Sequence, residues 1–132
     1  MKLKKIIYSE LNAKAQEMYN FQKASAKLAD YGFTTMWLNN DWQGADFIAI
    51  HADGVTDIKV QLKGGLAFNK RYIGKDIFIC FITDEEVYLY PHDLILKQIE
   101  HRIADNRWNK AGKWFATRLT NENKRLLEPY LL

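Results

Sequence analysis

The sequence has one cysteine, Cys80, and only two prolines among its 132 residues. A lone cysteine cannot form an internal disulfide, which excludes a disulfide-stapled domain. No apolar run approaches the roughly 20 residues of a membrane-spanning helix. Within residues 1–7 only Ile6 and Ile7 are adjacent apolar residues, too few for the core of a signal peptide. We therefore expect a cytoplasmic protein with no membrane partner and a reduced, buried thiol at Cys80.

A large excess of charge of one sign is also missing. Nineteen Lys and Arg residues oppose sixteen Asp and Glu residues, giving a net charge of +3 and a pI near 8.9. This balance permits binding to a polyanion without requiring it, so an anion-binding patch must come from local clustering. The hydrophobic content of 48% is that of a globular chain, and the length suits a single domain.

The hydrophobic pattern predicts an α+β domain with a mixed sheet flanked by helices. Residues 9–31 have helical spacing, with Ser9 as the expected N-cap and Gly32 as the terminator. Strands are expected at 33–38, 46–51, 56–63, 77–82 and 87–90, and further helices at 91–102 and 120–128. Residues 39–44, 68–75 and 105–113 are polar or Gly-containing and are expected to be connections.

Three polar residues fall at informative places on this framework. Asp46 opens one strand, and Gln61 and Lys63 lie two positions apart on the next. Residues two apart on a strand share a face, so Gln61 and Lys63 point the same way. The hairpin between the strands can bring Asp46 beside Gln61. Taken alone, Gln61 and Lys63 fit a solvent-facing strand, but Asp46 and the element order favour a site.

An acid, an amide oxygen and an ammonium group at one point are the mixture that phosphodiester hydrolysis requires. A divalent cation held by hard oxygen ligands polarises a phosphoryl oxygen and activates a bound water. A lysine can orient that water and stabilise the negative charge of the transition state. The backbone carbonyl of Leu62 is a natural additional metal ligand.

The segment 44–50 (GADFIAI), a hairpin, and the segment 60–64 (VQLKG) together resemble the PD-(D/E)XK nuclease superfamily, which includes restriction endonucleases and Holliday-junction resolvases. The long first helix and the apolar strand at 77–82 match as well. The resemblance covers about residues 12–90 and implies a restriction endonuclease-like fold. We expect one domain, 1–132, with a nuclease-like core at about 9–102 and a helical tail at 103–132 that the resemblance does not cover. The resemblance also implies a DNA substrate and Mg²⁺ or Mn²⁺ as cofactor.

Carried over by position, the resemblance makes Asp46 the first metal-binding acid and Lys63 the catalytic lysine. Gln61 takes the second acidic position, and Glu17 corresponds to an additional acid on the first helix. A neutral amide at Gln61 removes one negative charge, which Glu17, Asp41 or Asp57 would have to replace. An exposed helical carboxylate is the alternative for Glu17.

Four further residues are candidates for contacts with nucleic acid. Lys70, Arg71 and Lys75 form a basic loop that can grip phosphates, although such clusters are often simply solvated. Trp42 can stack on a base or, alternatively, cap the sheet. His51 and His92 lack a ligand-like or triad-like setting and are expected to be structural, and His101 is expected to be a surface residue.

We therefore predict a metal-dependent DNA endonuclease, with a homodimer as a possible state because nucleases that cut both strands often pair. The main alternative is a catalytically inactive nuclease-like fold that binds nucleic acid or protein. An unrelated α+β protein with a chance motif is the third reading.

Overall fold

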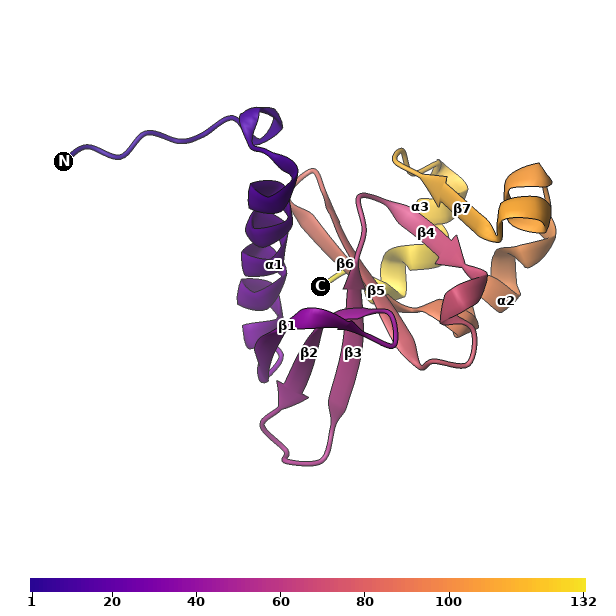
Figure 1. Ribbon diagram of the computed structural model, residues 1–132, viewed down its shortest axis with the longest axis horizontal. Coiled ribbons are helices and arrows are strands. Elements are labelled where there is room, and N and C mark those ends of the chain that lie inside the picture. The colour runs from indigo at the N-terminus through magenta and orange to yellow at the C-terminus, as the bar shows by residue number, and fades with distance from the viewer.

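The computed structural model describes residues 1–132, apart from the side chain at position 41 (Figure 1). Helices and strands follow one another in the order α1 (Ala13–Ala29), β1 (Phe33–Trp42), β2 (Ala45–His51), β3 (Asp57–Leu62), β4 (Leu66–Asn69), β5 (Ile77–Thr83), β6 (Glu86–Pro91), α2 (His92–Ile103), β7 (Lys113–Ala116) and α3 (Asn121–Leu127). Short helical turns precede α1, follow β4, separate α2 from β7 and follow α3. The predicted α+β class is confirmed.

The first helix begins later than its spacing predicts. Ser9 lies in a separate 3₁₀ turn, Tyr8–Glu10, so its prediction as the N-cap is wrong. Asn12 caps α1 instead, because its side chain accepts a hydrogen bond from the amide of Ala15 at 2.9 Å. At the other end Gly32 has a φ of +85°, the left-handed conformation that ends helices.

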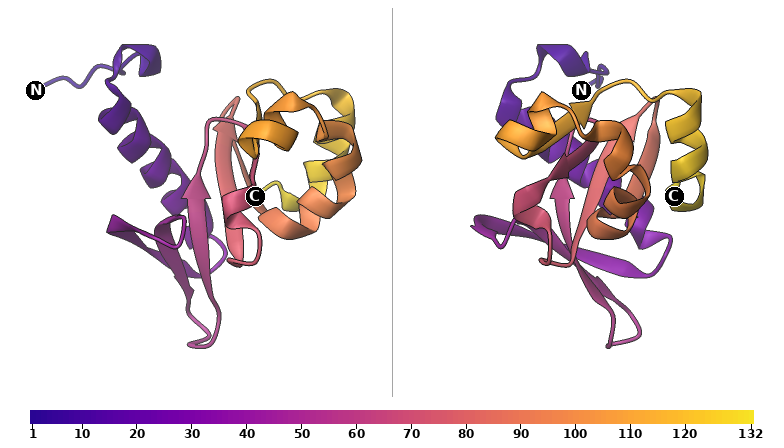
Figure 2. Two further views of the ribbon diagram at one scale, coloured as in Figure 1. Left: turned by 45° about the vertical axis from the view of Figure 1, so that its right-hand side comes forward. Right: turned by 90° about the vertical axis from the view of Figure 1, so that its right-hand side faces the viewer.

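Five strands form a mixed sheet in the order β1-β2-β3-β5-β6. The β3–β5 pair is parallel and the other pairs are antiparallel. The predicted strands at 46–51, 56–63, 77–82 and 87–90 are all present. In Figure 2, α1 covers one face of this sheet while α2, α3 and the β4–β7 sheet lie on the other.

The strand β1 is longer than predicted, because residues 39–42 extend it rather than forming a connection. The turn to β2 is reduced to Gln43 and Gly44, which have φ values of 51° and 90°. Two successive positive φ values are what a tight two-residue hairpin requires. The register between β1 and β2 shifts between Trp37 and Trp42.

A second, two-stranded sheet pairs β4 with β7. The predicted loop at 68–75 therefore begins as a strand and continues as a 3₁₀ turn, Lys70–Tyr72. The tail after residue 103 contains the predicted helix, whose N-cap is Thr120, but β7 was not predicted. Both short strands are held by pairing across more than forty residues of sequence, which no local pattern encodes.

The strand β5 is covered on both faces, as its continuous apolar run predicts. Cys80 packs on the α1 side with Leu28, Phe47 and Val60. Ile79 faces the other side with Tyr90, Ile95 and Leu127 in a second cluster. Cys80 is fully buried, and burial raises the pKa of its thiol to about 12. None of the helices in the described part of the chain has the length and apolar character needed to cross a bilayer.

Candidate nuclease site

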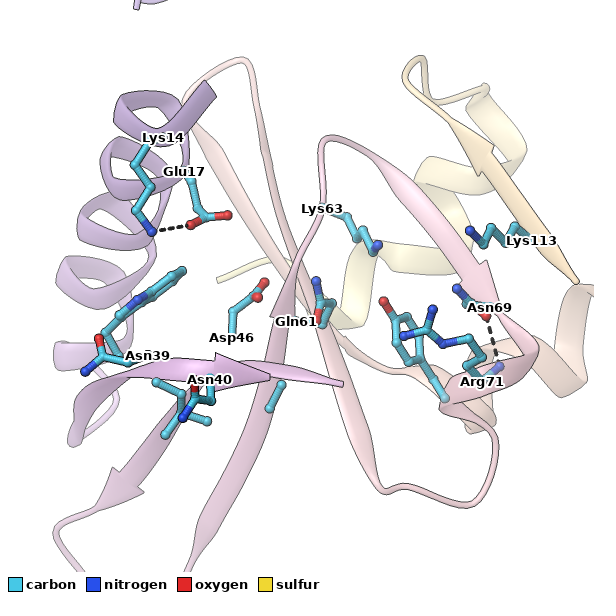
Figure 3. Close-up of a pocket in the computed structure, with 14 residues that line it drawn as sticks. Lys14, Glu17, Asn39, Asn40, Asp46, Gln61, Lys63, Asn69, Arg71 and Lys113 are labelled. Carbon is cyan, nitrogen blue, oxygen red and sulfur yellow. Dashed lines mark hydrogen bonds and ion pairs between the residues drawn. The ribbon is translucent and has the colours of Figure 1, made fainter. Parts of the chain in front are cut away.

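The candidate site lies where β2 and β3 run side by side (Figure 3). Phe47 pairs with Val60 in the antiparallel ladder, and both side chains are completely buried on the α1 side. Because neighbouring residues on a strand face opposite sides, the preceding Asp46 and the following Gln61 share the other face. The Asp46 Oδ2 atom accepts a hydrogen bond from the amide of Leu62 at 2.9 Å. The Asp46 carboxylate is thus fixed at the end of β3.

Gln61 and Lys63 lie on this same face. The Gln61 Nε2 atom donates to the carbonyl oxygen of Leu62 at 3.3 Å, so the amide group and that carbonyl are neighbours. The amide of Lys63 donates to the carbonyl of Cys80 at 2.9 Å, which continues the β3–β5 ladder past the end of β3. The Lys63 Nζ atom lies 5.5 Å from the centre of the Tyr72 ring, a cation–π contact.

These residues open into one pocket with a volume of about 410 Å³. It is lined by Asp46, Gln61 and Lys63 together with Glu17 of α1. The described charged residues of its lining are two acids and four cations: Glu17, Asp46, Lys14, Lys63, Arg71 and Lys113. In Figure 3 the two acids lie on the α1 side, while Lys63, Arg71 and Lys113 lie toward β4 and β7. This positive balance favours an anionic ligand.

The structure brings Glu17 to the pocket, with a side chain that is 39% exposed. Its Oε1 atom lies 3.1 Å from the Nζ atom of Lys14 on the same helix. Lys14 in turn lies over the ring of Trp37, 5.2 Å from its centre. Glu17 therefore faces the site as an ion pair rather than as an isolated carboxylate.

Of the four residues predicted to contact nucleic acid, two line a pocket at the site and two do not. Arg71 lines the pocket, and Lys75 lines a neighbouring pocket that Arg71 also borders. Lys70 does not line either one, since its Nζ atom lies 5.2 Å from the centre of the Trp108 ring. Trp42 is 58% exposed at the end of β1 and also lies outside both linings.

The oxygen donors fit Mg²⁺ or Mn²⁺ by chemical type, since they are a carboxylate of Asp46, an amide of Gln61 and the carbonyl of Leu62. In the described part of the chain no three His, Cys, Asp or Glu side chains gather in a way that could hold a metal ion. Neutral oxygens would have to complete such a site. Asp57 cannot contribute because it lies at the other end of β3, and the side chain of Asp41 lies outside the described residues.

Sequence reasoning missed most of the other residues of the pocket lining, among them Asn69, Tyr72 and Lys113. Lys113 reaches the site because β7 pairs with β4 in a register that places it opposite Asn69. The basic segment 70–75 was visible in the sequence, but the β7 strand that adds a further cation was not. Only the long-range pairing could have revealed it.

A buried histidine holds the segment that carries Arg71. The Nε2 atom of His92 accepts the amide hydrogen of Asn69 at 3.1 Å, so Nδ1 carries the proton and donates to Asp93 at 2.7 Å. Burial lowers the pKa of His92 despite its contact with Asp93. Partial burial raises the pKa of Asp93, but hydrogen bonds from Gly74 and His92 outweigh it and leave that pKa below its usual value. His92 is thus structural, as predicted.

Comparisons with known proteins gave one informative match. No family model matches the chain, and no curated protein matches it by sequence. The solved structure of a bacterial homing endonuclease, I-Ssp6803I, is similar with a TM-score of 0.53, covering 91% of this chain and 86% of that chain. The sequence identity is 17%, so the likeness concerns the fold. The chain has a nuclease-like fold. Its membership of the PD-(D/E)XK superfamily remains a prediction from the motifs.

Proposed function

We propose that this nuclease-like chain is a divalent-metal-dependent DNA endonuclease. The observation that supports it best is the convergence of Asp46, Gln61 and Lys63 on one pocket in a fold similar to that of a homing endonuclease. The cationic wall of that pocket supports a polyanionic substrate. DNA is the substrate class that the name of the structural neighbour suggests.

In this proposal Asp46, Gln61 and the Leu62 carbonyl would hold Mg²⁺ or Mn²⁺. When bound, such a cation polarises a phosphoryl oxygen and lowers the pKa of a coordinated water. Lys63 would bind a non-bridging oxygen of the scissile phosphate and keep the attacking water in line. Glu17 would add a second carboxylate from the α1 side of the pocket.

The test is cleavage of duplex, branched and single-stranded DNA with Mg²⁺ or Mn²⁺, and with EDTA as the metal-free control. We expect Lys63→Ala to reduce the cleavage rate about a hundredfold or more, as loss of a transition-state contact does in other enzymes. Lys59→Ala is the matched control, because Lys59 lies on the same strand and face but outside the pocket. If the wild type cuts none of these DNAs, or Lys63→Ala cuts as well as the wild type, the proposal is wrong.

The metal ligand is tested separately by isothermal titration with Mg²⁺ and Mn²⁺. Asp46→Asn should abolish measurable metal binding, whereas Asp57→Asn removes an exposed carboxylate at the far end of β3 and should not. Gln61→Glu restores a negative charge and should tighten metal binding. Equal metal affinity in the wild type and Asp46→Asn would contradict the assignment.

A second candidate is a nuclease-like fold that binds nucleic acid without cutting it. The neutral Gln61 supports it, as does the lack of a cluster of three acidic, histidine or cysteine side chains among the described residues. This candidate predicts DNA binding that is unchanged by EDTA, no cleavage, and no metal affinity that depends on Asp46. The same cleavage and titration experiments therefore separate the two.

A further inference from the structure

A second pocket adjoins the candidate site. Its volume is about 420 Å³, and its described lining is Gln43, Gly44, Arg71, Tyr72 and Lys75. Arg71 and Tyr72 also line the candidate site, so they form the wall between the two pockets. The second pocket thus extends the site toward the turn that joins β1 to β2.

The segment that supplies both cations is held rigidly by side chains from α2. The amide of Asn69 donates to His92 Nε2 at 3.1 Å, and the amide of Gly74 donates to Asp93 Oδ2 at 2.9 Å. Between these points, Asn69 Oδ1 accepts the amide hydrogen of Arg71 at 2.9 Å. Tyr72 is 5% exposed and packs edge-on against His92. Because its backbone is fixed at both ends, this segment needs little backbone ordering on binding.

Among the side chains that the structure describes, no carboxylate pairs with Arg71 or Lys75. None of the acidic residues described by the structure lines the second pocket. Arg107, by contrast, is neutralised by Asp105 at 2.9 Å. Two cations on one wall, in a pocket whose described lining holds no carboxylate, are complementary to a single anionic group.

We propose that Arg71 and Lys75 bind a second backbone phosphate of the DNA, flanking the phosphate held at Lys63. This inference rests on the proposed function. Arg71, at the shared wall, fixes the direction in which the strand leaves the site, and Lys75 closes the far side of the second phosphate. Two phosphates held in sequence set the register of the strand over Asp46 and Lys63, although such contacts read no bases.

The first experiment measures duplex DNA binding by fluorescence anisotropy over a series of salt concentrations. EDTA is present to prevent metal-dependent cleavage. Arg71→Gln and Lys75→Gln should each weaken binding about tenfold, the size expected for a lost charged hydrogen bond. Each should also reduce the slope of log affinity against log salt by about one. Lys70→Gln is the matched control, because Lys70 lies in the same segment but outside both pockets.

The second experiment places single neutral methylphosphonate linkages along the duplex. One linkage other than the cleaved one should weaken binding of the wild type but not weaken Arg71→Gln or Lys75→Gln further. The phosphate site is wrong if these variants bind like Lys70→Gln, or if every neutral linkage affects wild type and variants equally.

Cleavage by the wild type and by Asp46→Asn is measured alongside, so that the two proposals fail in different ways. If the wild type does not bind DNA, both fail. If Asp46-dependent cleavage occurs while Arg71→Gln and Lys75→Gln bind normally, only the second phosphate site fails. If the phosphate site is found without cleavage, only the catalytic proposal fails.

Discussion

The hydroxyl of Tyr90 joins the two sheets. It donates to the carbonyl of Ala67 at 2.7 Å and accepts the amide hydrogen of the same residue at 3.0 Å. Tyr90 is completely buried and Ala67 is 4% exposed, so water cannot replace either bond. One edge of β4 pairs with β7, and no strand of the large sheet pairs with its other edge. The Tyr90 hydroxyl supplies the hydrogen-bonding partner of β4 at that other edge.

Tyr90→Phe removes the hydroxyl and changes little else in the shape of the side chain. It leaves one buried donor and one buried acceptor of Ala67 without a partner. Each unsatisfied buried group costs about 1–3 kcal/mol, so we expect the free energy of unfolding to fall by about 2–6 kcal/mol. That is a large share of the roughly 5–15 kcal/mol that stabilises a typical domain.

The assay is urea unfolding followed by tryptophan fluorescence, with Tyr88→Phe as the matched control. Tyr88 lies on the same strand, is 6% exposed and stacks on Phe81. Its hydroxyl forms no hydrogen bond to a described residue, so Tyr88→Phe should cost under about 0.5 kcal/mol, as do substitutions that disturb no buried contact. Equal stability of the two variants would refute the role assigned to Tyr90.

Two further predictions concern the same region. Gly65→Ala should destabilise the fold by about 1–3 kcal/mol in urea unfolding, because the added Cβ would lie 2.3 Å from the carbonyl oxygen of Ala116. Gly64→Ala should be tolerated, because its Cβ would meet only a ring atom at 3.6 Å. Equal loss of stability in the two variants would contradict the steric reasoning. The pKa of His92 in the folded protein lies below its ordinary value of 6.5. Below pH 6.5 the unfolded chain therefore binds a proton that the folded chain excludes. As the pH is lowered from 6.5 to the folded pKa, the free energy of unfolding should fall by up to about 1.4 kcal/mol per pH unit. His92→Gln should remove this dependence and the exposed His101→Gln should not; an unchanged pH profile in His92→Gln would exclude His92 as its source.

Local sequence patterns were sufficient for the central part of the site. The alternation of apolar and polar residues on β3 places Gln61 and Lys63 on one face, because the side-chain period of a strand is two. The short hairpin at 52–56 then fixes the β2–β3 register, so Asp46 has to lie beside Gln61. The apolar run of β5 likewise predicts a strand buried on both faces.

Local patterns failed where two nearby residues could both cap a helix, or where pairing with another strand decided the conformation. Ser9 and Asn12 can both cap a helix, and the choice of Asn12 depends on how the chain enters α1. Residues 39–42 have the composition of a turn, but they extend β1, and Trp42 pairs with Ala45 of β2.

The sequence by itself determined the order of the elements, the face that carries Asp46, Gln61 and Lys63, and the chemistry that these residues offer. Each of these follows from contacts between near neighbours in the chain. The tertiary structure alone decided the second sheet, and with it the positions of Arg71 and Lys113 around the pocket. In that sheet the amides of Ala67 and Asn69 donate hydrogen bonds to Tyr90 and His92, each 23 positions away. Local periodicity does not encode contacts over such separations.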